Sequence, residues 1–273
     1  MEFAGVAMRD QQVHIGITPD QARAANAMQR RRLLGTLREL PPQAWTLPSR
    51  CAGWSVQDVV RHLAQMNGVF LDALAAAEAG ERFDGFRTYD PKRTPDEWVR
   101  EMREISAAQT LADFEASTIA ILAACEGLDD DGTTPVATPA GRQPWPRGIL
   151  HALFDSSVHE RDVLDAVAIA AEPDEDMVAV AMYQVLLAAR IACLVGASFD
   201  AELRLSGGPT LSVSVAGPVV SVQLGAADGD GLLVGIGEAV ATLDAMAGRG
   251  RLDEALDAPP QLHAALSGLS ALL

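Results

Sequence analysis

The sequence predicts an N-terminal four-helix bundle over residues 1–170 and a small C-terminal α+β domain over residues 171–273. Three observations predict this fold class. The length of 273 residues suits two domains of ordinary size. Apolar residues recur at helical spacing through most of the first 170 residues. Several later segments instead alternate apolar and polar residues between turn signals, which is typical of half-buried strands.

The predicted bundle helices begin at clear capping signals. Thr18 precedes a proline and an acid, which is a typical helix start, and Pro41-Pro42 ends that helix. Ser55 and Asp58 have the spacing of a capping box in front of a long apolar stripe. Four long helices joined by loops fit a bundle, and we expect residues 1–17 and 127–145 to be irregular. The expected helices span about residues 18–40, 55–79, 110–126 and 146–167, with a short helix from residue 94.

The second domain is expected to begin after Glu172-Pro173-Asp174, where the pattern changes. Its central strands should form a small antiparallel meander, because each alternates apolar and polar residues between Gly or Pro positions. The expected elements are a helix at 176–195, strands at 202–205, 210–215, 219–224 and 232–234, and helices at 238–246 and 261–273.

The charge balance excludes some classes of function. The chain has 21 basic and 37 acidic residues, and its net charge of −16 repels phosphate backbones. We therefore expect no nucleic-acid partner. The basic run Arg30–Arg32 is expected to form a solvated helix face.

The cysteines and the apolar segments bear on location. Cys51, Cys125 and Cys193 are odd in number and widely spaced, which disfavours a disulfide framework and a CxxC metal site. The sequence has neither a signal-peptide pattern nor an uninterrupted apolar run of about 18 residues. We therefore expect a cytoplasmic protein with no membrane partner.

Three of the five histidines lie on the two helices with the clearest patterns. Asp155 and His159 are four residues apart, so they share one face of the last bundle helix. His62 lies within the second helix and supplies a third ligand if the two helices pack side by side. Two nitrogens and one oxygen match an open divalent-metal site, with Zn²⁺ as the leading candidate.

Spacing alone leaves alternatives open. His62 also fits a core histidine, and Asp155 with His159 also fits a surface pair. His151 lies on a similar face of the last bundle helix, but it is about two turns, roughly 12 Å, from His159. These two histidines therefore cannot easily bind one ion.

Residues 49–63 read SRCAGWSVQDVVRHL, and a second pattern lies on the last bundle helix. Both stretches resemble the DinB-like, mycothiol-dependent maleylpyruvate isomerase family, and residues 49–63 resemble its signature. The second pattern is an acid four residues before the His of a Val-His pair, with Asp three residues later, here Asp155, Val158-His159 and Asp162. The order of a bundle and a small α+β domain is also similar, so the resemblance spans nearly the whole chain.

The resemblance implies a metal-binding bundle with His62, Asp155 and His159 as the three ligands. The family's usual acid is Glu, so Asp155 is a departure. A side chain that is shorter by one methylene must approach the ion more closely or bind it differently.

The resemblance also implies two arginines that bind an anionic group of the substrate or the thiol. These are Arg93, with Lys92 as the competing alignment, and Arg249 in a Gly-Arg-Gly turn. The planar fork of arginine suits a carboxylate because it can donate two parallel hydrogen bonds. The alternative for each is a solvated surface arginine.

By resemblance, the protein is a metal-dependent enzyme that uses mycothiol, a small-molecule thiol, on a small and anionic activated electrophile. Metal coordination favours the thiolate, which is the nucleophile. In an isomerase the thiolate adds to an activated alkene, allows bond rotation and leaves, whereas in a thiol S-transferase it stays on the product. The alternative from another class is a non-catalytic protein that binds a metal or a small ligand.

No protein nucleophile is required by this mechanism, and none is expected from the sequence. Cys51 shows no activating neighbour in its local sequence. Trp54 and Trp145 are expected to pack at the ends of the bundle rather than to stack on a ligand.

Overall fold

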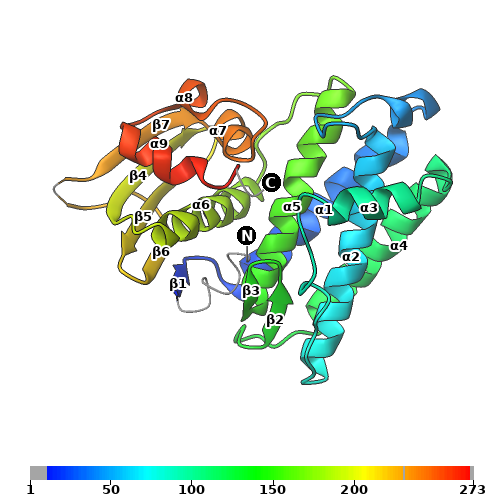
Figure 1. Cartoon of the computed structure of the whole chain (residues 1–273), viewed down its shortest axis with the longest axis horizontal. Coiled ribbons are helices and arrows are strands. Elements are labelled where there is room, and N and C mark those ends of the chain that lie inside the picture. Colours follow the sequence, from blue (N-terminus) through cyan, green and yellow to red (C-terminus); the bar gives the residue numbers. More distant parts are fainter. Residues whose placement is uncertain (1–10, 230, 271–273) are drawn as a thin grey trace. The chain divides into compact units, whose positions relative to one another are not determined.

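The computed structural model describes residues 11–229 and 231–270, and the chain divides into two compact units. The bundle unit comprises Thr18–Ala171. The sheet unit comprises Glu172–Leu273 together with the N-terminal segment that contains strand β1, Gln12–Ile15. The predicted fold class, a helical bundle plus a small α+β domain, is confirmed (Figure 1).

The bundle unit is built on four long helices, α1, α2, α4 and α5 (Figure 1). Helix α2 packs on α4 and α5, and α1 packs on the same two helices, while the short helix α3 packs on α2. Each long helix lies close to its expected bounds. The helices are α1 (Pro19–Glu39), α2 (Val56–Glu78), α3 (Thr94–Glu101), α4 (Ala107–Glu126) and α5 (Trp145–Ala166).

The predicted capping signals are present at both early helices. Thr18 accepts a hydrogen bond from the backbone of Gln21, whose side chain returns one to Thr18. Ser55 and Asp58 form the same reciprocal box at α2. Asp58 also accepts a hydrogen bond of 2.8 Å from the buried Arg61. Burial raises the pKa of Asp58, but the Ser55 hydrogen bonds and Arg61 outweigh it, so the net shift is downward.

One element appears where the sequence predicted an irregular connection. Strands β2 (Pro135–Thr138) and β3 (Gly141–Pro144) form a short antiparallel hairpin before α5. Val136 is fully buried, and Gly141 provides the positive φ of 96° at the turn. The segment contains three prolines, and Val136 is the one buried apolar residue of its two strands, so its alternation is too brief to predict strands.

Two hydrophobic clusters stabilise the bundle, one toward each end. One cluster contains Met66, Phe70, Ile121 and Trp145. The other includes Leu33, Leu63, Phe114 and Val163, among others. Between the two clusters, α1, α2, α4 and α5 contribute a layer rich in polar residues. This polar layer comprises Asn26, Gln29, Arg30, His62, Asn67, Ser117, Thr118, Asp155, Ser156, His159 and Glu160.

The basic run on α1 is not a uniformly solvated face, which corrects the expectation from sequence. Arg31 is exposed, but Arg30 is only 1% exposed and crosses the bundle to donate to Asn67 at 2.6 Å. Arg32 is half-buried and pairs with the buried carboxylate of Glu160. Helical periodicity turns one of three consecutive residues toward the core, and here that residue is an arginine.

The sheet unit is built on six strands in the order β1-β6-β5-β4-β7-β8 (Figure 1). Strands β4 (Phe199–Ser206), β5 (Thr210–Ala216) and β6 (Val219–Leu224) form the predicted antiparallel meander. Strand β7 (Leu233–Glu238) adds to β4 in parallel, and β8 (Leu256–Asp257) closes that edge.

The opposite edge of the sheet is formed by a strand that the sequence analysis missed. β1 pairs in parallel with β6, with Gln12 opposite Val219. β1 is only four residues long, so its alternation of apolar and polar residues is brief. Its pairing partner β6 lies about 200 residues away along the chain. A parallel edge strand of this kind leaves little local signal.

Helices α6 (Met177–Leu194), α7 (Ala239–Met246) and α9 (Pro260–Ser267) pack on this sheet, with the short helix α8 (Leu252–Ala255) beside α7. α6 is long and apolar enough to cross a membrane by length and composition, but 78% of it is buried inside the unit, as in the core helix of a folded domain. The expected last helix, 261–273, corresponds to α9, and residues 271–273 lie outside the described residues.

Candidate metal centre

Helices α2 and α5 bring together the three predicted ligands. His62 Nε2 lies 3.7 Å from Asp155 Oδ2, and His159 Nε2 lies 3.9 Å from Asp155 Oδ1. The two imidazole rings are 4.8 Å apart and nearly perpendicular. One ligand atom of each residue lies within 4.8 Å of the others. The carboxylate of Asp155 therefore lies between two imidazole nitrogens that point toward it.

These separations fit an ion better than they fit direct hydrogen bonds. Nitrogen–oxygen hydrogen bonds are about 2.7–3.2 Å long, which is shorter than both distances. Ligands bound tetrahedrally at about 2.0–2.1 Å from zinc lie roughly 3.3 Å apart. Both nitrogen–oxygen separations exceed that spacing by roughly half an ångström. The donor set of two imidazoles and one carboxylate is also that of catalytic zinc sites.

Burial gives the three groups different acid–base properties. Burial lowers the pKa of His62, which is 2% exposed. Burial also opposes ionisation of Asp155, but the imidazoles of His62 and His159 outweigh it and hold the pKa of Asp155 well below its usual range. An ion bound here would lie against an ionised carboxylate and, at His62, an imidazole that favours its neutral, metal-binding form.

His159 is held from its far side by a buried carboxylate. Asp162 Oδ2 lies 3.1 Å from His159 Nδ1, and Arg50 Nε donates to Asp162 Oδ1 at 3.0 Å. Burial lowers the pKa of His159, but Asp162, Cys51 and Asp155 outweigh it and raise that pKa to about 10. With its Nδ1 proton directed at Asp162, His159 presents Nε2 toward Asp155. A carboxylate partner on the second nitrogen is common for histidines that bind metal.

Two residues near the centre were not assigned to it from the sequence. Cys51 Sγ donates to Asp162 Oδ2 at 3.1 Å and lies 3.6 Å from His159 Nδ1. The ring of Trp54 lies 5.3 Å from that of His62 and 6.2 Å from that of His159, and its Nε1 donates to Asp96. Trp145, in contrast, is fully buried at the far end of α5. The Cys-x-Gly-Trp stretch before α2 contains both Cys51 and Trp54. Its spacing alone does not show that this loop folds back over α5.

Polar contacts fix α5 beside the candidate centre. The carboxylate of Glu160 accepts hydrogen bonds from Arg32 Nε at 3.0 Å and Nη2 at 2.8 Å. Gln29 Nε2 donates to the same carboxylate at 3.1 Å. These bonds join α1 to α5 at the residue that follows His159. They restrain the rotation of α5 that sets where His159 points.

The structure also locates the remaining predicted site residues. His151 is half-buried and lies beside Phe70, outside the ligand groups found among the described residues. Arg93 is exposed and pairs with Glu97 at 3.1 Å. Lys92 is exposed beside it. Arg249 belongs to the sheet unit, where it is half-buried and donates to the carbonyl of Ala247 at 3.1 Å.

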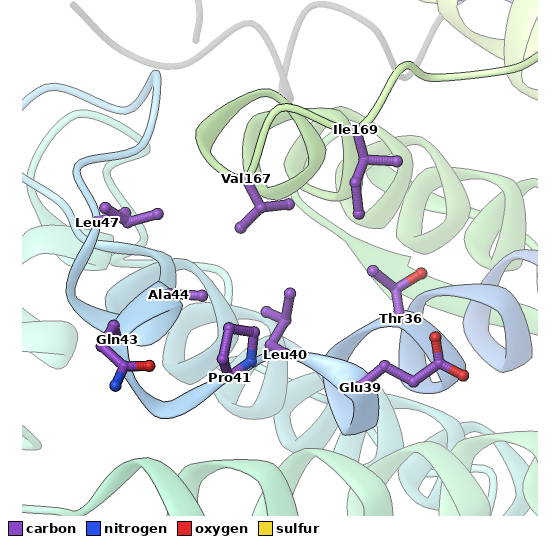
Figure 2. A pocket seen from close by; sticks show the side chains of 9 residues that line it. All are labelled: Thr36, Glu39, Leu40, Pro41, Gln43, Ala44, Leu47, Val167 and Ile169. Carbon is purple, nitrogen blue, oxygen red and sulfur yellow. The ribbon is translucent and has the colours of Figure 1, made fainter.

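A separate cavity lies at the end of the bundle formed by the C-terminal ends of α1 and α5. Its volume is about 460 Å³. In Figure 2, Val167 and Ile169 face Leu40 and Pro41 across it. None of the three candidate ligands lines this cavity, and its charged lining residue is Glu39. Its lining is mostly apolar and differs from the polar layer that holds His62 and His159.

Comparisons with known proteins bear on the family and the fold of the chain. The family model described as the mycothiol maleylpyruvate isomerase N-terminal domain matches residues 27–164, just over half of the chain. Two crystal structures of the mycothiol-dependent maleylpyruvate isomerase, one of them a mutant, match with a TM-score of 0.63 and 14% identity. Each match covers 89% of this chain and 93% of the other.

Other comparisons are weaker. The colibactin self-resistance protein ClbS, solved in complex with a dsDNA, matches at 17% identity with a TM-score of 0.47, over 56% of this chain and 98% of that chain. No curated protein sequence matches the chain. The likeness to the isomerase structures shows the fold. The family match covers more than half of the chain and includes all three candidate ligands, and the chain therefore belongs to the mycothiol maleylpyruvate isomerase N-terminal domain family.

Proposed function

We propose that this chain is a divalent-metal-dependent enzyme that uses a small-molecule thiol, mycothiol, as nucleophile on a small anionic electrophile, as a maleylpyruvate isomerase does. The observation that carries the proposal is the convergence of His62, Asp155 and His159 in a member of this family. A divalent cation, with Zn²⁺ as the leading candidate, would supply a Lewis acid that favours the thiolate form of a bound thiol.

The chain's own residues prepare this centre in three ways. Asp155 supplies the negative charge between the two imidazoles, and it is the most accessible of the three, with a side chain 23% exposed. Asp162 holds a proton of His159 on Nδ1, so an ion that binds at Nε2 displaces only the proton on that nitrogen. Trp54 covers the two imidazole rings and reduces the access of water to them. None of these roles requires a nucleophile from the protein.

A buried cation in the same polar layer supports an anionic substrate. Arg30 is 1% exposed, and its hydrogen bonds to described residues go to the neutral amide oxygens of Asn26 and Asn67. Burial lowers the pKa of Arg30 to about 10, while Asp155 opposes that shift, so the guanidinium stays charged near neutral pH. A buried cation without a carboxylate partner favours an anion nearby. With a dication at the centre, the layer would carry excess positive charge that a thiolate and a carboxylate would balance.

Arg249 and Arg93 remain proposed contacts to an anionic group of the substrate or the thiol. Arg249 is the stronger candidate, because it is half-buried, and its guanidinium donates to a backbone carbonyl. The planar fork of a guanidinium suits a carboxylate. Arg93 is exposed and already shares its charge with Glu97, which makes it the second candidate.

The experiment that tests the function is thiol-dependent turnover by the purified protein. Metal-loaded parent protein is mixed with mycothiol and maleylpyruvate, and the products are separated and identified. We expect turnover that requires both thiol and metal, and that is lost in His62→Ala. An isomerised product without attached thiol indicates an isomerase, whereas a thioether product indicates an S-transferase.

A non-catalytic binding protein would give a different result. It would bind metal and thiol in calorimetry without converting maleylpyruvate or another activated alkene. Turnover that is equally fast in parent and metal-free protein would contradict the proposed role of the centre.

A further inference from the structure

Two possible ligand sets share His159, one on each of its ring nitrogens. On the Nε2 side lie His62 and Asp155. On the Nδ1 side lie Cys51 and Asp162, and Cys51, His159 and Asp162 also present ligand atoms within 4.8 Å of one another. Because the two sets take different nitrogens of one ring, something must determine which nitrogen binds the ion.

The second set is a serious competitor for the metal. Its atoms are separated by 3.6 Å from Sγ to Nδ1, 3.1 Å from Sγ to Oδ2 and 3.1 Å from Nδ1 to Oδ2. These separations are close to those between ligands of a tetrahedral zinc site. A thiolate is also a softer zinc ligand than a carboxylate, and the set with Cys51 and Asp162 offers one more negative charge. Affinity alone would therefore favour the second set.

The hydrogen bonds around Asp162 oppose that outcome. Its carboxylate is fully buried and accepts from Arg50 Nε on Oδ1 at 3.0 Å. On Oδ2 it accepts from the Cys51 thiol and lies 3.1 Å from His159 Nδ1. In this arrangement the protons of the thiol and of Nδ1 occupy the positions that an ion would need. Arg50 offsets the carboxylate charge that would otherwise attract the ion.

We propose that Arg50, through its ion pair with Asp162, selects the ligand set: the ion binds at Nε2 of His159, and Cys51 is kept out of the metal's coordination. This inference rests on the proposed metal centre and adds a positioning role for Arg50 and Asp162. Its consequence for the proposed function is that the thiol at the metal comes from the cofactor and not from the protein. Cys51 bound to the ion would occupy the position that an incoming thiol needs.

The test uses Co²⁺ bound to the purified full chain, because thiolate ligation gives Co²⁺ a strong near-ultraviolet charge-transfer band that imidazole and carboxylate ligands do not. The parent should show no such band. Arg50→Met should show it, and Arg50→Met with Cys51→Ser should lose it again. Arg50→Lys, which keeps the positive charge, should resemble the parent. Arg32→Met is the matched control, because it removes an arginine that pairs with Glu160, the neighbour of His159, and leaves the Arg50–Asp162 ion pair in place.

A second measurement does not depend on the spectrum. The dissociation constant for Zn²⁺ is determined by competition with a chromophoric chelator. His62→Ala should lose most of its affinity, and adding Arg50→Met should restore it by roughly 10- to 100-fold, the usual effect of residues that contact metal ligands. The regained affinity should disappear when Cys51→Ser is added. If Arg50→Met does not fold, as judged by far-ultraviolet circular dichroism, Arg50→Gln removes the charge while keeping a donor.

The outcomes separate this inference from the proposed function. A thiolate band in the parent overturns the inference, because Cys51 would then already be a ligand. Absence of the band in both charge-removing variants, with no regained zinc affinity, also overturns it. A parent that binds Co²⁺ without the band, shows the predicted variant spectra and has no thiol-dependent turnover would support the ligand selection while contradicting the proposed enzyme.

Discussion

Asp155 provides the sharpest test of the candidate centre, because it is the only carboxylate of its ligand set. Asp155→Asn keeps the size and shape of the side chain and removes its charge. The carboxylate oxygens lie 3.7 and 3.9 Å from the two imidazole nitrogens, so no other group of the set can take over the negative charge.

The expected magnitude follows from this geometry. Substitutions of residues that only contact metal ligands cost about 10- to 100-fold in metal affinity. Loss of an anionic ligand itself should weaken metal affinity by at least the upper end of that range, about 100-fold or 2.7 kcal/mol. Asp155→Glu should stay within about tenfold of the parent. The two nitrogen–oxygen separations are larger than those in a tetrahedral site, so a longer side chain can approach the ion without moving α5.

The assay is a competition titration of metal-free protein with a chromophoric chelator and Zn²⁺, together with elemental analysis of the purified variants. Circular dichroism at the helix bands serves as the control for folding. If Asp155→Asn binds zinc within threefold of the parent, Asp155 is not a ligand and His151 becomes the residue to substitute. Equal losses of zinc affinity in Asp155→Asn and Asp155→Glu would contradict the argument from side-chain length.

Three further predictions test the site and its support. His62→Ala and His159→Ala should each lose most bound metal while the bundle still folds, because Ala favours helix, whereas His151→Ala should keep its metal. Metal content is measured by elemental analysis. Parent-like metal in both His62→Ala and His159→Ala would exclude His62 and His159 as ligands. Arg249→Ala should keep the metal and weaken turnover or thiol binding by roughly 10- to 150-fold, because a charge-assisted hydrogen bond contributes about 1.5–3 kcal/mol, and Arg249→Lys should recover part of the loss. Steady-state kinetics with thiol and substrate varied separately measures this effect. Parent-like kinetics would leave the Gly-Arg-Gly turn with a structural role alone. Asp58→Ala should lower the free energy of unfolding by about 2–3 kcal/mol in urea titrations at neutral pH, since it removes a helix cap and the partner of a buried arginine. Because folding lowers the pKa of Asp58, the greater stability of the parent is present above the unfolded pKa of about 4 and should shrink as the pH falls below it. A difference in the free energy of unfolding that is constant from pH 7 to pH 3 would refute the charge-based part of the explanation.

Much of the bundle could be predicted because its signals are local. Thr18 and Ser55 mark the starts of α1 and α2 through side-chain hydrogen bonds to residues three positions away. Asp155 and His159 lie on one face of α5 because of helical geometry alone. The alternating strands β4 to β6 were likewise visible in the sequence, since each pairs with its neighbour along the chain.

The features that were missed depend on distant contacts. The strand β1 exists because its residues 12–15 meet β6, whose residues 219–222 lie about 200 positions later. Arg30 is buried because α1 presents it toward Asn67 on a different helix. A short segment or a single charged residue carries no local pattern that reports such a partner.

The sequence by itself determined the types and positions of the helices, the alternating strands and the i, i+4 spacing of Asp155 and His159. Only the tertiary structure decided that α2 and α5 pack so that His62 faces that pair, and that the loop before α2 brings Cys51 and Trp54 to His159. The physical reason is that local hydrogen bonds and side-chain periodicity fix each element independently. The choice of neighbouring elements is made by the burial of whole faces, which no single stretch of sequence contains.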